Sequence, residues 1–172
     1  MQVTATPQPS KDFVISREFN APRHLLWQCF TDPERMTQWW GPKGVKIIKS
    51  KMDLRVGGTY LYGMQPPDGK IMWGRMVYRK IDPPARLEFI NSFSDEAGGL
   101  TRHPMAPGWP LEMFSVFSFE ELGPTKTKFT VRWAPHNPTD EEQKAFDAGH
   151  DSMTMGWSGT LDKLENYVKG AA

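Results

Sequence analysis

Apolar and polar residues alternate through the middle of the chain, whereas near both ends apolar residues recur every three or four positions. Period two is typical of β-strands, and a spacing of three or four is typical of amphipathic helices. The first stretch, DFVISREF (12–19), predicts a strand with Phe13, Ile15, Arg17 and Phe19 on one face. Arg17 is the single charged member of that face.

Two short helices are predicted after this strand. Asn20 is the candidate cap of the first, and the second follows Asp32 and ends at Trp39 and Trp40, because a Gly-Pro pair comes next. Neighbouring residues on a helix point about 100° apart, so the two tryptophans cannot share one buried stripe. We expect one ring to anchor the helix and the other to face a pocket, and the sequence leaves open which does which.

The centre of the chain predicts an antiparallel meander. Six further strands, separated by turns rich in Gly and Pro, are expected at 45–54, 59–64, 71–81, 86–93, 112–122 and 127–134. A long segment, 94–110, interrupts them and carries His103, Met105 and Trp109. Long loops in compact domains are often functional, although a plain surface loop is an equal alternative here.

The C-terminal segment 137–170 predicts one continuous helix of roughly 45 Å. Thr139 and Glu142 form a capping-box pattern at its start. Its apolar stripe contains Phe146, His150, Met153, Trp157, Leu161, Leu164 and Val168. Gly149 and Gly156 interrupt the pattern, so we expect a bend or a close approach at these positions.

These elements predict one α+β domain at 12–169, in which a curved antiparallel sheet of about seven strands grips the long helix. Residues 1–11 and 170–172 are expected to be flexible tails. Twenty-one basic and 20 acidic residues give a net charge of +1, which argues against nucleic acid and anionic membranes as partners. A cytoplasmic location is expected, because the single cysteine, Cys29, cannot form an internal disulfide and no signal peptide or membrane span is visible.

The histidines are scattered and Cys29 stands alone, so no metal site and no cofactor are expected. The sequence also lacks a nucleophile elbow, a zinc-protease motif and a phosphate-binding glycine loop. No residue is therefore assigned a catalytic role. Seven Trp, ten Phe and ten Met residues instead indicate either a thick core or the lining of a cavity.

Four motifs, in this order, carry a family resemblance: REFNAPRHLLWQCFTDPERMTQWWGP, DLRVGGTYLYGMQPPDG, IDPPARLEF and MGWSGTLDKLENYV. They resemble the heat-shock-protein-90 ATPase activator-like family of the START-like (SRPBCC) superfamily, over roughly residues 12–169. The resemblance implies the helix-grip fold and a cavity between sheet and helix that commonly receives hydrophobic small molecules. Only eleven residues precede the matching region, whereas the co-chaperone that names the family has a further N-terminal domain, which counts against chaperone activation.

Eleven residues are predicted to line this cavity: Arg17, Trp39, Trp40, Trp73, Met76, Met113, Ser115, Phe117, His150, Met153 and Trp157. Both faces of strand 71–81 are apolar, so either Trp73 or Met76 could point inward. His150 is either a core histidine bonded to a carbonyl or carboxylate, or a residue that contacts the ligand. Arg17 is expected to form a structural ion pair, with Glu112 or Asp53 as candidate partners.

The sequence thus predicts a protein that binds a hydrophobic, aromatic small molecule. One alternative is a cyclase- or hydrolase-type enzyme that uses the same cavity, with His150, Arg17 and His103 as candidate acid-base residues. Another is a co-chaperone-like protein-interaction module, which would require an exposed patch outside the cavity. A homodimer and a chaperone partner stay open.

Overall fold

The computed structural model describes residues 12–171, so the tail expected at 1–11 lies outside the described residues. The strands are β1 (Phe13–Phe19), β2 (Lys46–Met52), β3 (Thr59–Gln65), β4 (Met72–Asp82), β5 (Arg86–Ser94), β6 (Leu100–Thr101), β7 (Met113–Gly123) and β8 (Lys126–Pro135). The helices are α1 (Arg23–Thr31), α2 (Pro33–Trp39), α3 (Asp140–Ala148) and α4 (His150–Ala171). The last helix therefore continues to Ala171, where the sequence predicted a tail from residue 170.

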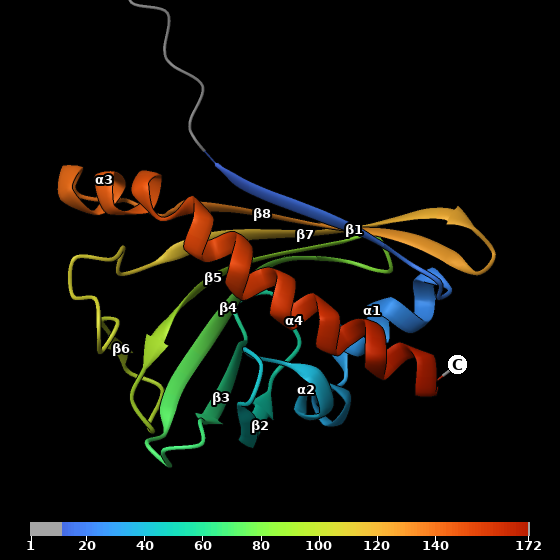
Figure 1. The fold of residues 1–172 in the computed structure, drawn as a ribbon, viewed down its shortest axis with the longest axis horizontal. Helices are drawn as coiled ribbons and strands as arrows, with labels where there is room; N and C mark the ends of the chain where they lie inside the picture. Colours follow the sequence, from blue (N-terminus) through green and yellow to red (C-terminus); the bar gives the residue numbers. More distant parts are fainter. Residues whose placement is uncertain (1–11, 172) are drawn as a thin grey trace, which may run out of the picture.

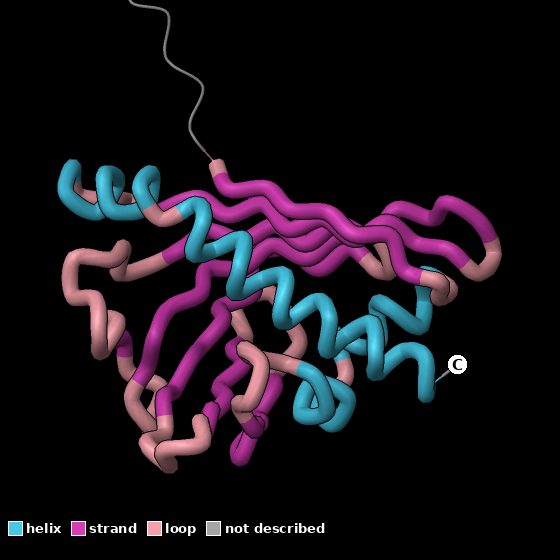
Figure 2. Tube along the Cα trace, in the orientation of Figure 1, coloured by secondary structure: helices cyan, strands magenta, loops and turns pink. Residues whose placement is uncertain are grey.

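The strands form one antiparallel sheet in the order β1-β8-β7-β5-β4-β3-β2, with the short β6 added beside β5. The sheet is strongly curved, and α4 runs across its concave side with α1 and α2 beside the C-terminal half of α4 (Figure 1). Figure 2 shows α4, α1 and α2 lying along one side of the curved sheet, whereas α3 lies at the end of the sheet. The predicted helix-grip fold, including the two helices after β1, is confirmed.

Strand alternation fills this interior with large side chains. Phe30 of α1 packs against Phe117, Phe119 and Phe129, with ring centroids 4.7–5.3 Å apart. Buried residues of α4 close the core from the other side: Met153, Trp157, Leu161, Leu164 and Val168. Each buried side chain of this size contributes roughly 1.5–3 kcal/mol, so the packing of α4 on the sheet makes a large contribution to the stability of the domain.

Two local predictions about helix ends are wrong. Pro22, with no side-chain hydrogen bond, stands at the N-cap of α1, so Asn20 does not cap that helix. The C-terminal segment is two helices separated at Gly149, which has a non-helical conformation and donates its N–H to the Phe146 carbonyl at 3.0 Å. The interruption expected at Gly149 is thus confirmed, whereas Gly156 lies within α4 with no neighbour within 4 Å of an added Cβ. The capping box of Thr139 and Glu142 is confirmed, but it starts the short α3 and not a continuous helix.

Candidate functional site

A cavity of about 540 Å³ lies between the concave side of the sheet and the N-terminal half of α4. Its sheet wall comes from Tyr62, Met64, Gly74, Met76, Phe89, Asn91, Ser92, Phe93, Met113, Phe117 and Trp133. The opposite wall comes from Gly149, Ser152, Met153, Gly156, Trp157 and Thr160, and the ends from Trp40, Gly41, Pro42, His103, Ala106, Trp109, Pro110 and Leu111. Pro42, Ser152 and Gly156 are exposed, so they mark where the cavity opens to solvent.

The pairing register of the sheet decides which strand residues face the cavity. Met76, Asn91 and Met113 stand opposite one another on β4, β5 and β7 and form one row across the wall. Gly74 lies beside them without a side chain, and the ring of Tyr62 fills the space that a Cβ at Gly74 would occupy. Apart from Ser92, the strand residues of the cavity wall are therefore alternate residues of their strands.

Trp39 and Trp40 have different environments, which answers the question that the sequence left open. Trp39 is fully buried and donates its indole N–H to the Cys29 carbonyl at 3.0 Å. Trp40 lines the cavity and meets Tyr62 and Trp157 edge to face, each with ring centroids 5.9 Å apart. Trp39 anchors α2, so its predicted place in the cavity lining is wrong.

Four more predicted lining residues lie outside the cavity: Trp73, Ser115, His150 and Arg17. Trp73 is on the outer face of β4, three positions from Met76, with the Lys49 ammonium 5.6 Å from its ring centroid. Ser115 is fully buried behind Asn91, to whose side-chain oxygen it donates. His150 packs edge to face on Phe13 and Phe146 outside the cavity.

The hydrogen-bond partner expected for a buried His150 is also missing. Its Nε2 is inaccessible to solvent and has no hydrogen-bond partner within the described residues. Neither of the two interpretations of this histidine is therefore correct, because it contacts aromatic rings and not a carbonyl, a carboxylate or the cavity. The predicted residues that the structure does place along the cavity are Trp40, Met76, Met113, Phe117, Met153 and Trp157.

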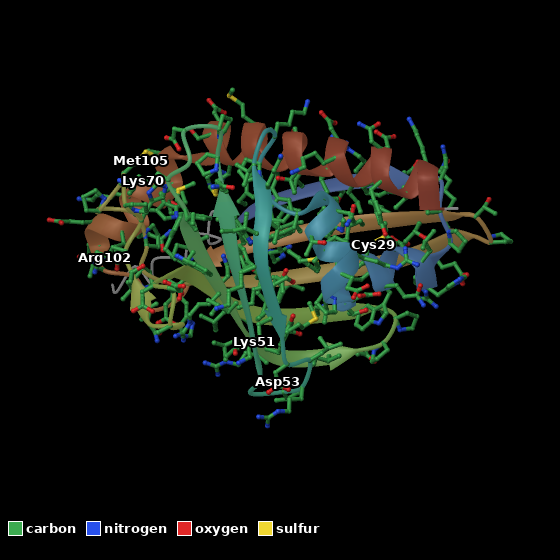
Figure 3. All side chains as sticks on the ribbon, turned by 90° about the horizontal axis from the view of Figure 1, so that it is seen from below. Cys29, Lys51, Asp53, Lys70, Arg102 and Met105 are labelled. Atoms are coloured by element: carbon green, nitrogen blue, oxygen red, sulfur yellow. The ribbon has the colours of Figure 1, made fainter. Side chains whose placement is uncertain are left out.

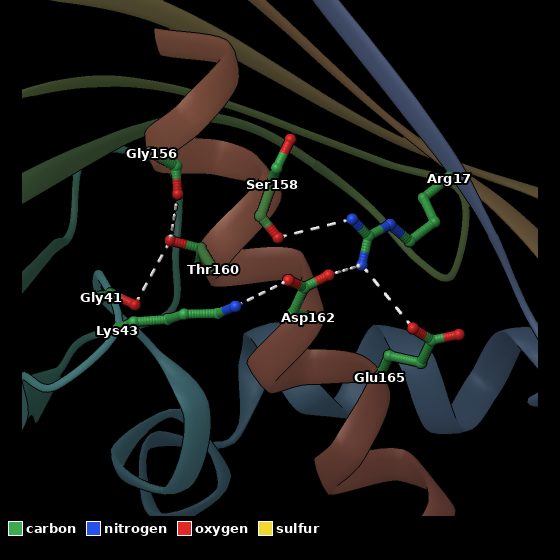
Figure 4. A network of polar contacts seen from close by, with 8 residues as sticks. All are labelled: Arg17, Gly41, Lys43, Gly156, Ser158, Thr160, Asp162 and Glu165. Carbon is green, nitrogen blue, oxygen red and sulfur yellow. Dashed lines mark hydrogen bonds and ion pairs between the residues drawn. The ribbon is translucent and has the colours of Figure 1, made fainter. Parts of the chain in front are cut away.

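Arg17, the fifth residue placed outside the cavity, belongs to a polar network on the far side of α4 (Figure 4). Its guanidinium lies 2.8 Å from Asp162 and 3.7 Å from Glu165, and not near either of the predicted partners. Lys43 contacts the second Asp162 oxygen at 2.9 Å, and these two cations lower the pKa of Asp162. The network joins β1 and the segment after α2 to α4.

Lys163 and Thr160 of α4 hold the same segment after α2 at points nearer the cavity. The Lys163 ammonium lies 3.2–3.3 Å from the backbone carbonyls of Trp40, Gly41, Pro42 and Val45. The Thr160 hydroxyl lies 3.2 Å from the Gly41 carbonyl and 3.1 Å from the Gly156 carbonyl, and its one hydrogen is shared between these two acceptors. The rim of the cavity that contains Trp40 is thus fixed by side chains of α4.

The opposite end of the cavity is closed by loop 102–111. Trp109 of this loop packs over Gly149, where an added Cβ would stand 2.8 Å from the indole ring. Glu142 holds both ends of the loop, because one of its carboxylate oxygens accepts hydrogen bonds from the Arg102 guanidinium and the Leu111 N–H, each at 2.9 Å. The other oxygen accepts from the Thr139 N–H, also at 2.9 Å.

These hydrogen bonds lower the pKa of Glu142 to about 2, with the bond from the Thr139 N–H as the largest cause. Because the folded pKa lies below the ordinary value of 4.5, this carboxylate stabilises the fold above about pH 4.5 and loses that contribution as the pH falls toward 2. We expect Glu142→Gln to lower the free energy of unfolding by about 2 kcal/mol at neutral pH. In acid the variant and the wild type should differ much less. Urea unfolding at several pH values measures this.

Glu141→Gln is the matched control, because Glu141 is exposed in the same first turn of α3. It is expected to change stability by only a few tenths of a kcal/mol. If the free energies of unfolding of the two variants changed with pH in the same way, the role of Glu142 would be contradicted.

The cavity wall offers little acid-base chemistry. Burial raises the pKa of Tyr62 to about 12, so its hydroxyl stays neutral. Burial lowers the pKa of His103, whose Nδ1 accepts the Met105 N–H at 3.1 Å. Burial also raises the pKa of the Cys29 thiol to about 11, and Figure 3 shows Cys29 on α1, well away from the loop that carries Met105. Within residues 12–171, no three His, Cys, Asp or Glu residues are grouped as metal ligands.

Sequence reasoning missed several lining residues, most of all Tyr62, Asn91, Trp133 and the loop residue Trp109. The signal for Asn91 was present, because Leu87, Phe89, Asn91 and Phe93 alternate along one face of their strand. No local pattern indicates Trp109. Its position depends on the break at Gly149.

Comparisons with known proteins agree with this geometry. The family model described as "Activator of Hsp90 ATPase homolog 1-like protein" matches residues 20–169. A protein from Arthrobacter aurescens has a similar structure, with a TM-score of 0.76 and 23% identity over 98% of this chain and 93% of that one. A protein from Mycobacterium smegmatis gives a TM-score of 0.70 and 25% identity over 91% and 90% of the two chains.

The AHSA1 protein from Silicibacter pomeroyi is also similar, with a TM-score of 0.69 and 20% identity over 94% of this chain and 99% of that one. Among curated proteins, none matches this sequence significantly. None of the helices in the described residues combines the length and the apolar character that a membrane span requires.

Proposed function

The chain belongs to the activator of Hsp90 ATPase homolog 1-like family, and we propose that it binds a hydrophobic, aromatic small molecule in the cavity between the sheet and α4. The observation that carries the proposal is the composition of the cavity wall. Twelve of the 25 lining residues are aromatic or methionine, and none of the lining residues carries a formal charge at neutral pH. Pockets of several hundred Å³ with such walls bind flat apolar molecules.

The rim of the cavity supports the same function. Trp40 lies at one end and Trp109 at the other, and both are held by contacts with the C-terminal helices. Aromatic rings at an opening present large apolar surfaces with little conformational freedom to lose on binding. The proposal includes a cytoplasmic location, which the single buried and protonated cysteine supports.

Titration with a naphthalene-type dye tests the proposal, because Trp40, Trp109, Trp133 and Trp157 all border the cavity. A bound dye is expected to quench tryptophan fluorescence saturably, with a dissociation constant of about 1 μM, or about −8 kcal/mol. Native mass spectrometry of the purified protein would show a ligand that co-purifies. Absence of saturable binding by every aromatic probe would contradict the function.

Gly156 allows binding to be separated from folding. It lies on α4 at the opening of the cavity, and an added Cβ would have no neighbour within 4 Å. We expect Gly156→Leu to raise stability by about 0.5–1 kcal/mol through helix propensity, while its side chain occupies the opening and weakens dye binding about tenfold or more. Thermal unfolding and dye titration of the same sample measure both effects.

Gly170→Leu is the matched control, because Gly170 lies on the same helix, about 21 Å further along it, and its Cβ would also meet open space. Its dye affinity should equal that of the wild type. Unchanged dye affinity in Gly156→Leu would place the binding site elsewhere, whereas lost stability would show that this helix position is not free.

A further inference from the structure

The cavity wall contains polar groups but no charged ones. None of the lining residues is Asp, Glu, Lys or Arg. Hydroxyl, amide and imidazole groups along the cavity come from Tyr62, Asn91, Ser92, His103, Ser152 and Thr160, and the four lining tryptophans add indole N–H groups. A charged group on a ligand would therefore enter the cavity without a counter-charge, which is unfavourable because the ion loses its water and gains no partner.

Asn91 is the polar group in the middle of the sheet wall. The register places it between Met76 on β4 and Met113 on β7, so two apolar side chains flank it across the strands. Ser115, which is fully buried, donates its hydroxyl hydrogen to the Asn91 side-chain oxygen. This bond orients the amide, and the two N–H groups of its nitrogen have no acceptor within the described residues.

The other polar groups of the cavity are placed differently. The Ser92 hydroxyl and the indole N–H groups of Trp133 and Trp157 have no hydrogen-bond partner within the described residues, but these atoms are buried and inaccessible to solvent. The Thr160 hydroxyl bonds to the Gly41 carbonyl, and the His103 Nδ1 accepts the Met105 N–H. Ser152 is exposed at the opening. A ligand in the cavity would thus cover the Asn91 amide N–H groups. Covering them without supplying an acceptor costs binding free energy.

Resting on the proposed function, we infer that the ligand of this cavity is uncharged and carries a hydrogen-bond acceptor, such as a carbonyl oxygen, that receives the Asn91 amide. The apolar part of the ligand lies against the aromatic and methionine side chains around this point. Asn91 is then the residue that determines specificity, and Ser115 is a positioning residue that acts through it.

Three probes of similar shape test this inference: 2-acetylnaphthalene, 2-ethylnaphthalene and 2-naphthoate. The first has a carbonyl acceptor, the second has none, and the third is charged near pH 8. We expect the ketone to bind the wild type at least about tenfold more tightly than the carboxylate, because the cavity holds no cation. The carbonyl stretching frequency of the bound ketone should also be lower than in hexane, because a hydrogen bond weakens the carbonyl bond.

The affinity ratio of ketone to hydrocarbon is compared between each variant and the wild type. The difference in hydrophobicity between the two probes then cancels. In Asn91→Leu/Ser115→Ala, which removes both polar partners, the affinity ratio of ketone to hydrocarbon should fall about tenfold. Asn91→Asp keeps an acceptor for Ser115 but removes the donor, so it should lower the ratio as well. Asn166→Leu, the same change on the exposed side of α4, should leave the ratio unchanged.

An unchanged ratio in both Asn91 variants, a carbonyl frequency equal to that in hexane, or a carboxylate that binds as tightly as the ketone would overturn the inference while leaving a binding cavity. Failure of all three probes to bind the wild type would instead contradict the proposed function. The spectroscopic measurement uses the wild type alone, so it can overturn the inference even where a variant does not fold, and the variants identify Asn91 as the donor.

Discussion

Truncation after Asp147 is expected to abolish cooperative folding. It removes α4 and with it five buried side chains: Met153, Trp157, Leu161, Leu164 and Val168. At roughly 1.5–3 kcal/mol each, their combined contribution matches the ~5–15 kcal/mol by which domains are stable. The cut also leaves Arg17 and Lys43 without the Asp162 carboxylate. Circular dichroism during urea titration should show a gradual change without a transition.

Truncation after Lys169 is the control, because it removes the end of α4 and none of those side chains. This shorter deletion should shift the unfolding midpoint only slightly. A cooperative transition with native-like strand content after the deletion at Asp147 would show that the sheet is stable without the helix, and the helix-grip account of the core would be wrong.

The order of elements could be predicted because it follows from local patterns. Period-two alternation in 86–93 and 112–122 predicts strands that become β5 and β7, and the Thr139–Glu142 pattern identifies the start of α3. The register was not predictable, because strand 71–81 is apolar on both faces. In the folded sheet, Met76 pairs with Asn91 and shares its face, which lines the cavity. Trp73 is three positions away and lies on the opposite face.

Residues that depend on contacts distant in sequence could not be assigned from the pattern. Arg17 and His150 share apolar faces with core residues, which predicts burial but not the neighbours. In the folded chain, Asp162 lies beside Arg17, and Phe13 and Phe146 flank His150. The pattern predicted an interruption at Gly149 but not the ring of Trp109, which a loop far away in sequence brings next to it.

Substitution of the two adjacent tryptophans should have opposite consequences for folding and binding. Trp39 is the structural residue of the pair. The Cys29 carbonyl lies in the last turn of α1, and the residue four positions later is Pro33, which has no N–H to donate. The Trp39 indole supplies the missing donor at 3.0 Å, and its ring packs on Phe30 with centroids 4.7 Å apart.

Trp39→Ala should therefore cost about 3–5 kcal/mol, through the cavity that it leaves and the carbonyl that it leaves unpaired. Trp39→Phe keeps most of the ring and should cost about 1–3 kcal/mol, mainly from the lost donor. Both values come from urea unfolding. Where the Trp39→Phe variant stays folded, its affinity for a naphthalene-type dye should be close to that of the wild type, because Trp39 does not line the cavity.

Trp40→Leu should show the converse. Trp40 lines the cavity, and its ring meets Tyr62 and Trp157 edge to face at 5.9 Å and Trp39 at 5.4 Å. A smaller apolar side chain loses these contacts but leaves the hydrogen bond that anchors Trp39 to the Cys29 carbonyl. We expect a smaller stability loss, of about 1–2 kcal/mol, and at least about tenfold weaker dye binding, since one aromatic wall of the site is gone. Weakened binding in Trp39→Phe together with wild-type affinity in Trp40→Leu would reverse the two assignments and move the binding surface to the other side of α2.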